Sequence, residues 1–424
     1  QSWYRIDQSY RKFTFYVRQS GQTSLMSELT KQIENYYSNH YLLKLNDRAA
    51  SVIDTIPQWE ASSIPLQKNF FRNYVQPFLN KDKKVCVIIS DALRYEIGEE
   101  LMRLIRQEDR YDATLEPALS MLPSYTQLGM AALLPHQTLT ILEDEQGTVL
   151  VDDHPSQGLT NRQKILKTAL NQTATAIKAD ELRKLNPEES RSLLREHEVV
   201  YVYHNRIDAM GDKRDSEEQV FEAVEDTHKD LIRIVKKLAN ANASNFLITA
   251  DHGFIYQDRA IDESDFLGEE VTGEKVFMRQ RRFIIGKGLK ETTGRHQFSS
   301  TQLGLKGDLE VQIPKSINRL RLKGSGSRFV HGGASLQEVV IPVIKINKKR
   351  QSDLSVVEVD ILSGASSTIT SGQLAVKFYQ AQPATEKVKP RFLMAGIYTL
   401  EGELISDCHN LTFDFISENP RERE

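Results

Sequence analysis

Five acidic or imidazole side chains follow three separate apolar runs of the sequence, and such side chains are common ligands of divalent metal ions. They are Asp91, Asp208, Asp212, Asp251 and His252. Carboxylate and imidazole groups bind zinc, manganese and magnesium. Aspartates gathered at one point would repel one another, whereas two divalent ions would neutralise them and leave open positions for an anionic substrate. The pattern therefore predicts a two-metal centre suited to phosphoryl chemistry.

Three short strands are expected to position these residues. The runs 85–89, 199–203 and 246–249 are rich in β-branched residues and alternate with stretches of helical spacing. Segment 220–238 carries an apolar stripe at helical spacing, so the last two runs form a strand–helix–strand unit. In open α/β sheets, ligands bind beyond the carboxyl ends of the strands. We therefore expect all three acidic segments at one edge of a mostly parallel sheet.

Each candidate ligand has a simpler interpretation when it is taken alone. Asp91 has the position of a helix cap, and Asp208 and Asp212 fit a solvated loop. The Asp-His-Gly sequence at 251–253 is more specific, because glycine permits a close approach of the backbone. His331, in Phe-Val-His-Gly-Gly, fits a turn histidine as well as a ligand. The joint occurrence of these residues favours the metal centre.

The chain divides into three predicted parts. Residues 1–81 are expected to be helical, and 82–350 form an α/β core. Within that core, 255–330 reads as a glycine-rich, basic insertion of short hairpins. Apolar residues alternate with period two in 351–424, which predicts a small antiparallel β-sandwich.

The composition is that of an ordinary soluble globular protein, with 39% hydrophobic and 27% charged residues among 424. A net charge of -3 gives no overall attraction to nucleic acid or membranes, so such binding would need a local patch. Only two cysteines are present, and no signal peptide or membrane-length apolar stretch is evident. We therefore expect a cytoplasmic protein without membrane contact, and the initial Gln1 suggests a fragment that lacks an N-terminal part.

Five motifs, found within residues 82–346, resemble the PglZ domain of the alkaline phosphatase superfamily, a domain of type 1 BREX phage-defence systems. They read VCVIISDALRYE, LPSYTQLGMAALLP, VYVYHNRIDAMGD, LITADHGF and RFVHGGASLQEVVIPV. The resemblance implies an alkaline-phosphatase-like fold in which helices flank a mostly parallel sheet. It leaves the helical N-terminal region and the C-terminal sandwich as additions to that fold.

The resemblance also implies two sets of metal ligands. The first set is Asp91, Asp251 and His252, and the second set is Asp208, Asp212 and His331. Zinc diesterases of the superfamily have a histidine at the position of Asp212, so the second site of this chain is harder and more anionic. Zinc is the first expectation for both ions, with manganese or magnesium as alternatives.

Superfamily members use a serine or threonine at a helix N-terminus as the nucleophile, ligated to the first metal. Thr126 is the preferred candidate because it opens a small-residue helical stretch, and Ser124 is the main alternative. Both hydroxyls would also fit simple helix caps. Arg94 and Asn205 are candidates for contacts with a phosphate oxygen, although a structural salt bridge fits Arg94 equally well. Four further histidines are expected to be surface or structural residues: His136, His154, His228 and His296.

A basic segment lies between the Asp-His-Gly motif and His331. Thirteen basic residues between 275 and 328 face only three acidic ones, a local surplus of ten. One interpretation is a solvated hairpin whose basic residues pair with acidic neighbours. The other is a cationic wall for a nucleic-acid backbone, with Phe283 or Phe298 stacking on a base. The nucleic-acid-binding candidates are Arg279, Arg281, Arg282, Lys287 and Lys290.

The leading hypothesis is a two-metal phosphodiesterase or nuclease of phage defence, with DNA favoured over RNA as the substrate. A phosphomonoesterase of the same superfamily is the first alternative, since it would share the metal core. The second alternative is a scaffold of a defence complex with a vestigial site. In that case, the helical region and the sandwich would contact other proteins of the complex.

Overall fold

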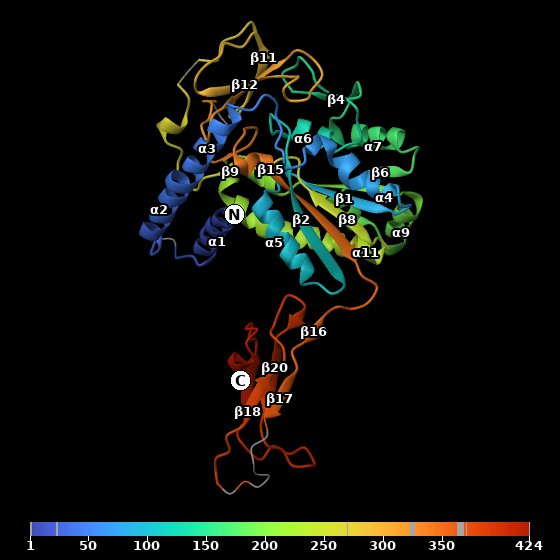
Figure 1. Cartoon of the computed structure of the whole chain (residues 1–424), viewed down its shortest axis with the longest axis vertical. Coiled ribbons are helices and arrows are strands. Elements are labelled where there is room, and N and C mark those ends of the chain that lie inside the picture. Colours follow the sequence, from blue (N-terminus) through green and yellow to red (C-terminus); the bar gives the residue numbers. More distant parts are fainter. Residues whose placement is uncertain are drawn as a thin grey trace. The chain divides into compact units, whose positions relative to one another are not determined.

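The computed structural model describes residues 2–22, 24–268, 270–322, 327–362, 369 and 371–423 (Figure 1). The chain forms two compact units. The first contains Gln1–Met102 and Ala113–Asn347, and the second contains Arg103–Asp112 and Lys348–Glu424. Lys323 of the basic segment lies outside the described residues.

A six-stranded sheet forms the centre of the first unit, with the strand order β2-β15-β8-β1-β7-β6. The strands are β1 (Val85–Ser90), β2 (Tyr111–Leu119), β6 (Ala174–Lys178), β7 (Val199–His204), β8 (Asn245–Thr249) and β15 (Val340–Lys348). Strands β6, β7, β1 and β8 pair in parallel, and β15 runs antiparallel to β8. The predicted α/β fold with a mostly parallel sheet is therefore confirmed.

The strand register aligns the ends of β1, β7 and β8 at one edge of the sheet, as predicted. Ser90 of β1 pairs with His204 of β7, and Ile89 pairs with Thr249 of β8. Every residue of β1 and β8 is buried, as expected for parallel strands that are covered on both faces. Because the three strands end at the same level, the segments that follow them leave the sheet side by side.

Helices surround this sheet (Figure 1). They include α5 (Tyr95–Arg106), α6 (Thr126–Ala132), α7 (Gly158–Ala169), α8 (Ala179–Lys184), α9 (Pro187–Glu196), α10 (Ile207–Gly211), α11 (Val220–Asn240) and α12 (Leu336–Val339). The apolar stripe of α11 is buried, which confirms the strand–helix–strand unit predicted between β7 and β8.

The predicted N-terminal helices are present and attach to the α/β core through buried charge. They are α1 (Tyr4–Gln19), α2 (Ser27–Asn35), the π-helix η1 (Tyr36–Leu42), α3 (Leu43–Ile53) and α4 (Gln76–Leu79). Arg11 of α1 is fully buried and pairs with Glu96 at 3.1 Å, with Glu100, and with Glu225 at 2.7 Å. A buried arginine needs such partners because an unpaired charge in the interior is costly.

The segment between the Asp-His-Gly motif and His331 contains a second sheet, antiparallel and in the order β10-β11-β13-β12. Its strands are β10 (Lys275–Arg279), β11 (Ile284–Lys287), β12 (Arg295–Ser299) and β13 (Glu310–Pro314). Both ends of the segment meet, because β9 (Ile255–Tyr256) pairs with β14 (Phe329–Val330). This pairing brings His331 back beside the loop that carries His252.

The second unit contains short strands that pair two by two. They are β16 (Ser355–Val356), β17 (Val359–Leu362), β18 (Lys377–Gln380), β19 (Val388–Lys389), β20 (Arg391–Ala395) and β21 (His409–Phe413). The β17–β18 and β20–β21 pairs are antiparallel, as the period-two pattern predicts. The β16–β19 pair is parallel and departs from the expected uniform antiparallel arrangement.

Candidate metal centre

The loops after β1, β7 and β8 are held together by backbone hydrogen bonds. The amide of Asp91 donates to the carbonyl of His204 at 2.9 Å, which joins the first loop to the end of β7. The amide of Ala92 donates to Oδ1 of Asp251 at 3.1 Å, which joins it to the loop after β8. Asp91 and Asp251 are therefore fixed beside each other, and both are buried.

His252 presents one ring nitrogen to these carboxylates. Its Nδ1 lies 2.8 Å from the carbonyl oxygen of Gly253, an acceptor, so Nδ1 carries the proton and Nε2 carries the lone pair. Nε2 lies 3.6 Å from Oδ1 of Asp91 and 3.4 Å from Oδ2 of Asp251. The hydroxyl oxygen of Thr126 lies 3.1 Å from the same nitrogen. This tautomer is the one that binds a metal ion through Nε2.

A second group of ligand atoms adjoins the first. Nε2 of His331 lies 3.8 Å from Oδ1 of Asp208, and the rings of His331 and His252 stack with centroids 4.2 Å apart. Two sets of candidate ligands result, one of Asp91, Asp251 and His252 and the other of Asp208, His252 and His331. Within each set the ligand atoms lie within 4.8 Å of one another, and His252 belongs to both.

Burial disturbs the ionisation of this cluster. It raises the pKa of Asp91, and repulsion from Asp251 and Asp208 raises it further. Burial also raises the pKa of Asp208, and it raises that of Asp251 to about 6. Burial, together with the charge of His331, lowers the pKa of His252 to about 3. The cluster therefore favours neutral side chains unless a cation compensates the carboxylates.

Four polar atoms of this cluster are buried without a hydrogen-bond partner among the described residues: Asp91 Oδ1, Asp251 Oδ2, Asp208 Oδ1 and His331 Nδ1. Leaving one buried polar atom unsatisfied costs about 1–3 kcal/mol. Three of them are carboxylate oxygens, which are ligands for zinc, manganese and magnesium alike. The donor set therefore fits divalent cations.

Close packing brings Thr126 to the centre. A Cβ atom built on Gly129 of α6 would lie 2.3 Å from the carbonyl oxygen of Asp251. A larger residue would push α6 away from the Asp-His-Gly turn, so glycine allows the first residue of α6, Thr126, to reach His252. Ser124 lies beside it but is engaged, since its hydroxyl donates to the carbonyl of Gly333 at 2.7 Å. Ser124 thereby ties this turn to the loop of His331.

Two buried side chains that sequence reasoning did not identify support the same loops. Gln67 donates to the carbonyl of Asp251 at 2.7 Å and accepts from the amide of Met121 at 3.0 Å. Asp7 accepts from Arg94, in the loop after β1, at 2.6 Å and from Tyr37 at 2.7 Å. Neither residue belongs to a recognisable motif, and only the tertiary structure brings them here.

Three predicted residues lie outside the two ligand sets. Asp212 is exposed at the end of α10, although its charge contributes to the raised pKa of Asp208, behind burial. Asn205 accepts a hydrogen bond from the amide of Ala209 at 2.9 Å. Arg94 is buried, pairs with Asp7 at 2.6 Å and lies over the Phe254 ring. The salt-bridge interpretation of Arg94 therefore matches its position better than a phosphate contact does.

The five nucleic-acid-binding candidates do not form one cationic wall. Arg282 is fully buried and pairs with Glu338 at 2.7 Å, so it cannot reach a surface ligand. Lys287 pairs with Glu143 at 2.6 Å, and half-buried Arg281 donates to the carbonyl of Leu322 at 3.2 Å. Arg279 and Lys290 are exposed, whereas Phe283 and Phe298 are buried and cannot stack on a base.

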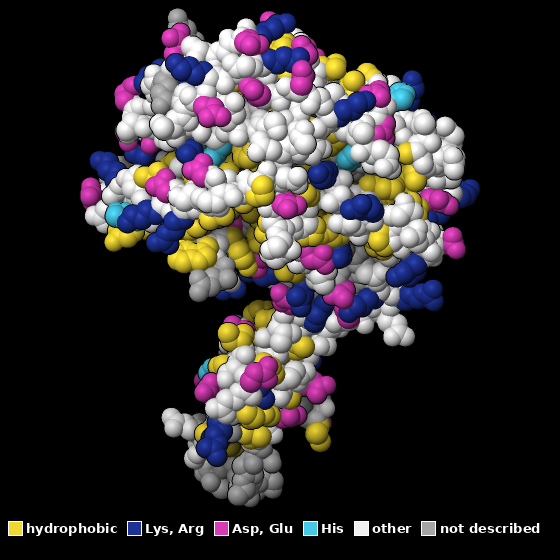
Figure 2. All heavy atoms as spheres, turned by 45° about the horizontal axis from the view of Figure 1, so that its top comes forward, with side chains coloured by type: hydrophobic (Ala, Val, Ile, Leu, Met, Phe, Trp, Pro, Cys, Tyr) yellow, Lys and Arg dark blue, Asp and Glu magenta, His cyan; other side chains and the backbone are white. Residues whose placement is uncertain are grey.

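Basic and acidic side chains are interspersed over the upper part of the surface in Figure 2. The local surplus of positive charge is thus reduced by burial and by acidic partners from other parts of the chain. Glu143 and Glu263, which pair with Lys287 and Arg321, both lie outside the window 275–328.

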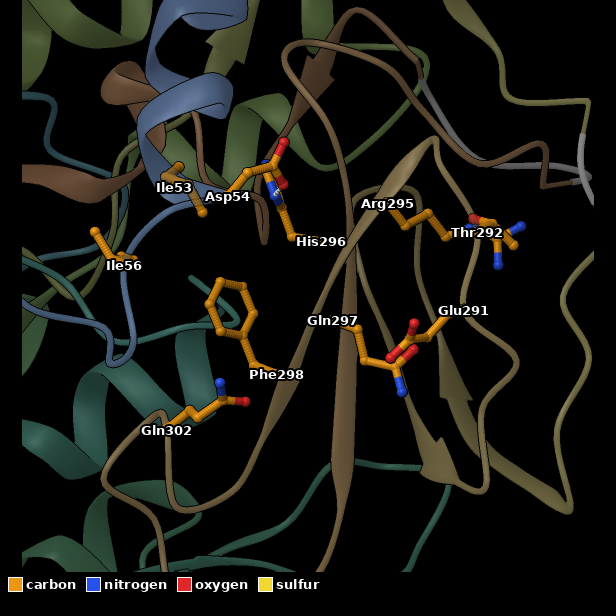
Figure 3. A pocket seen from close by; sticks show the side chains of 10 residues that line it. All are labelled: Ile53, Asp54, Ile56, Glu291, Thr292, Arg295, His296, Gln297, Phe298 and Gln302. Carbon is orange, nitrogen blue, oxygen red and sulfur yellow. Dashed lines mark hydrogen bonds and ion pairs between the residues drawn. The ribbon is translucent and has the colours of Figure 1, made fainter.

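His296 and His228 lie away from the metal centre. Nδ1 of His296 lies 2.9 Å from a carboxylate oxygen of Asp54, beside a cavity of about 240 Å³ (Figure 3). The cavity is lined by Ile53, Asp54, Ile56, Glu291, Thr292, Arg295, His296, Gln297, Phe298 and Gln302. His228 is buried with Glu100 and Glu225, whose charges Arg11 compensates.

The sheet, the crossover and the cluster of Asp and His side chains define an α/β domain with a candidate metal centre. The chain belongs to the PglZ family, the BREX system PglZ alkaline phosphatase-like domain, which matches residues 70–346. The prediction of this family is confirmed. In the described part of the chain, no helix has the length and apolar character needed to cross a membrane.

Two curated relatives align over nearly the whole chain. The alkaline phosphatase-like protein PglZ of Bacillus cereus (strain H3081.97) is 36% identical over 432 residues, which cover 99% of this chain and 50% of that protein. The alkaline phosphatase-like protein BrxZ of Escherichia coli O9:H4 (strain HS) is 37% identical over 427 residues, covering 97% and 49%. The chain thus spans about half the length of these relatives.

Solved structures show more distant similarity. Murine ectonucleotide pyrophosphatase / phosphodiesterase 5 aligns with a TM-score of 0.40 and 12% identity, covering 62% of this chain and 88% of that one. Phosphonoacetate hydrolase from Sinorhizobium meliloti 1021, in complex with phosphonoformate, aligns with a TM-score of 0.39 and 13% identity, covering 62% and 89%.

Proposed function

We propose that the chain is a metal-dependent phosphohydrolase whose centre binds two divalent ions, with zinc favoured over manganese or magnesium. The observation that carries this proposal is the pair of ligand sets that share His252, with three buried carboxylate oxygens lacking a partner in the described structure. Asp91, Asp251 and His252 hold the first ion, and Asp208 and His331 hold the second. Asp212 would join the second set only after its side chain turns toward Asp208.

Thr126 acts as the nucleophile in this proposal. Its oxygen attacks phosphorus in line, the bond to the leaving-group oxygen breaks, and water later cleaves the Thr126–phosphoryl bond. The hydroxyl proton passes to solvent, because Nε2 of His252 serves as a ligand. When bound, the ions would neutralise charge on the attacking and leaving oxygens. Gln67 holds the Asp251 loop to Met121, and Ser124 holds the turn before Thr126 to the loop of His331, during both steps.

The proposed substrate is a phosphodiester, with DNA preferred to RNA and the chain acting as a nuclease in phage defence. Arg279 ends β10 and Lys290 lies between β11 and β12; both are exposed and support backbone binding. The acidic partners of Lys287 support the alternative of a small monoester substrate, because they leave less free positive charge for a polyanion. Comparing the two substrate classes decides between these activities.

Other proteins of a phage-defence complex are the proposed partners. Support comes from β20, where Phe392 and Met394 alternate along the strand and are 75% and 70% exposed. Alternate positions of a strand lie on one face, so these side chains form an apolar strip suited to a protein contact.

The metal proposal is tested by anomalous scattering from crystals grown with zinc and by hydrolysis assays. Two ions roughly 3.5–4 Å apart are expected, one among Asp91, Asp251 and His252 and the other beside Asp208 and His331. Removal of the metal with chelator should abolish hydrolysis of an aryl phosphodiester, and Asp251→Ala should lose metal and activity together. Wild-type activity in Asp251→Ala would contradict the site. Two bound ions without hydrolysis of any phosphoester would favour the scaffold alternative.

A further inference from the structure

Arg162 of α7 lies near the edge of the sheet that the candidate metal ligands follow. Its guanidinium carbon is 4.9 Å from the centroid of the Tyr203 ring, close enough for a cation–π contact. Tyr203 precedes His204, whose carbonyl accepts the amide of Asp91 at 2.9 Å. Arg162 is therefore located near the carboxyl end of β7, where the Asp91 loop leaves the sheet.

The direction of β7 places Tyr203 toward the Thr126 end of α6. The Tyr201 hydroxyl donates to the carbonyl of Leu133, just past the other end of that helix, at 2.8 Å. Tyr203 lies on the same face as Tyr201, about 6.6 Å further along the strand toward Asp91. The guanidinium stacked on Tyr203 is thus displaced from Leu133 toward the candidate nucleophile.

The side chain of Arg162 is held but not neutralised. Its Nε donates to the carbonyl of Ser156 at 3.1 Å, and Gln163 fixes the same helix to β6 by donating to Thr175 at 2.8 Å. Among the residues that the structure describes, no carboxylate forms an ion pair with Arg162. The residue is half-buried, so solvent and ligands have access to it.

Other arginines near the loops differ in this respect. Arg94 pairs with Asp7 at 2.6 Å, and Arg206 pairs with Asp230 at 2.7 Å. Arg162 instead has the Tyr203 ring and the carbonyl of Ser156 as its recorded partners, and neither carries a negative charge. A bound anion would give this guanidinium the partner that the described protein does not supply.

We propose that Arg162 binds the non-bridging oxygens of the substrate's phosphoryl group, with the Tyr203 ring orienting the guanidinium plane. The planar fork donates two parallel hydrogen bonds to a phosphoryl group, which a lysine cannot reproduce. Such donors strengthen as negative charge develops during the displacement. This assignment rests on the proposed phosphohydrolase function and gives to Arg162 the role that the sequence suggested for Arg94.

The test measures binding of inorganic phosphate to zinc-loaded protein by calorimetry, alongside zinc content and hydrolysis of an aryl diester. Arg162→Gln should keep both ions, weaken phosphate binding roughly tenfold and lower kcat/KM roughly a hundredfold. Arg162→Lys retains the charge and should give intermediate losses. Lys164→Gln removes an exposed charge two residues along α7 and is the matched control, with no change expected.

Unchanged phosphate affinity in both Arg162 variants, with zinc bound, would overturn the assignment. If Arg162→Gln does not fold, Arg162→Lys alone decides, because wild-type affinity in that variant excludes a bidentate contact. Failure of the proposed function has a different signature. Zinc-loaded wild type would then hydrolyse no phosphoester, while the phosphate titration would still report whether Arg162 binds the anion.

Discussion

Replacing Asp251 by asparagine should stabilise the metal-free protein and weaken the metal-bound one. Burial raises the pKa of Asp251 to about 6, so its ionised form is disfavoured in the fold. Against an ordinary aspartate pKa of about 3.9, this shift corresponds to roughly 3 kcal/mol of lost stability at neutral pH. The folded state binds more protons than the unfolded state between these two pKa values. The contribution of Asp251 to the free energy of unfolding therefore falls as pH rises from about 4 to about 6 and stays constant at higher pH.

Asparagine fits the same position. Its Oδ1 can accept from the amide of Ala92, as Oδ1 of Asp251 does at 3.1 Å. Its amide nitrogen replaces the Oδ2 that lies 3.4 Å from Nε2 of His252, and it can donate to that lone pair. The substitution therefore removes a buried charge and satisfies an acceptor.

Urea unfolding at pH 5 and pH 8 measures the effect. In chelator at pH 8, Asp251→Asn should be more stable than wild type by up to about 3 kcal/mol, and by less at pH 5. With zinc the order should reverse, because the wild type gains binding energy that the variant lacks. Exposed Asp47→Asn is the control and should change stability by less than about 0.5 kcal/mol. An Asp251→Asn variant less stable than wild type in chelator at pH 8 would refute the reasoning.

Three further predictions concern the nucleophile, the substrate and the support of the loops. Thr126→Ala should keep its zinc and lose roughly three orders of magnitude in kcat, while Thr126→Ser retains part of it, as measured by steady-state kinetics. Ser124→Ala should lower the free energy of unfolding by about 1 kcal/mol and remain active. An inactive Ser124→Ala beside an active Thr126→Ala would make Ser124 the nucleophile instead of Thr126. Replacing Arg279 and Lys290 by glutamate should weaken DNA binding and reduce its dependence on salt, while hydrolysis of a small aryl diester stays unchanged. Equal effects on both substrates would contradict the nuclease proposal. Asp7→Asn should destabilise the fold by roughly 3–5 kcal/mol in urea, because it leaves the charge of Arg94 buried without a partner; a loss below about 1 kcal/mol would show that the ion pair contributes little.

The sequence was most informative where chemistry and strand periodicity coincide. Apolar β-branched runs that end in aspartate predict both the parallel strands and the edge at which their ligands gather. The observed register places Asp91 and Asp251 side by side as expected. This inference is reliable because residues that directly follow adjacent parallel strands must lie at the same edge of the sheet.

Charge counting along the sequence was less informative. Arg282 belongs to a basic cluster in the sequence, yet its partner Glu338 lies 56 residues away and both are buried. Lys287 pairs with Glu143, 144 residues distant. Such pairs depend on how the second sheet packs, and a local surplus of charge carries no information about that packing. Gln67 was missed for the same reason, since its role follows only from the carbonyls it meets.

The pairing of β9 with β14 has a consequence for how this domain can diversify. Because these strands close the neck of the 255–330 segment, changes of length in its exposed turns are absorbed beyond that neck. The spacing between His252 and His331 then stays fixed while the surface above them varies. Insertions or deletions in these exposed turns would therefore alter the surface above the centre without rebuilding the centre itself.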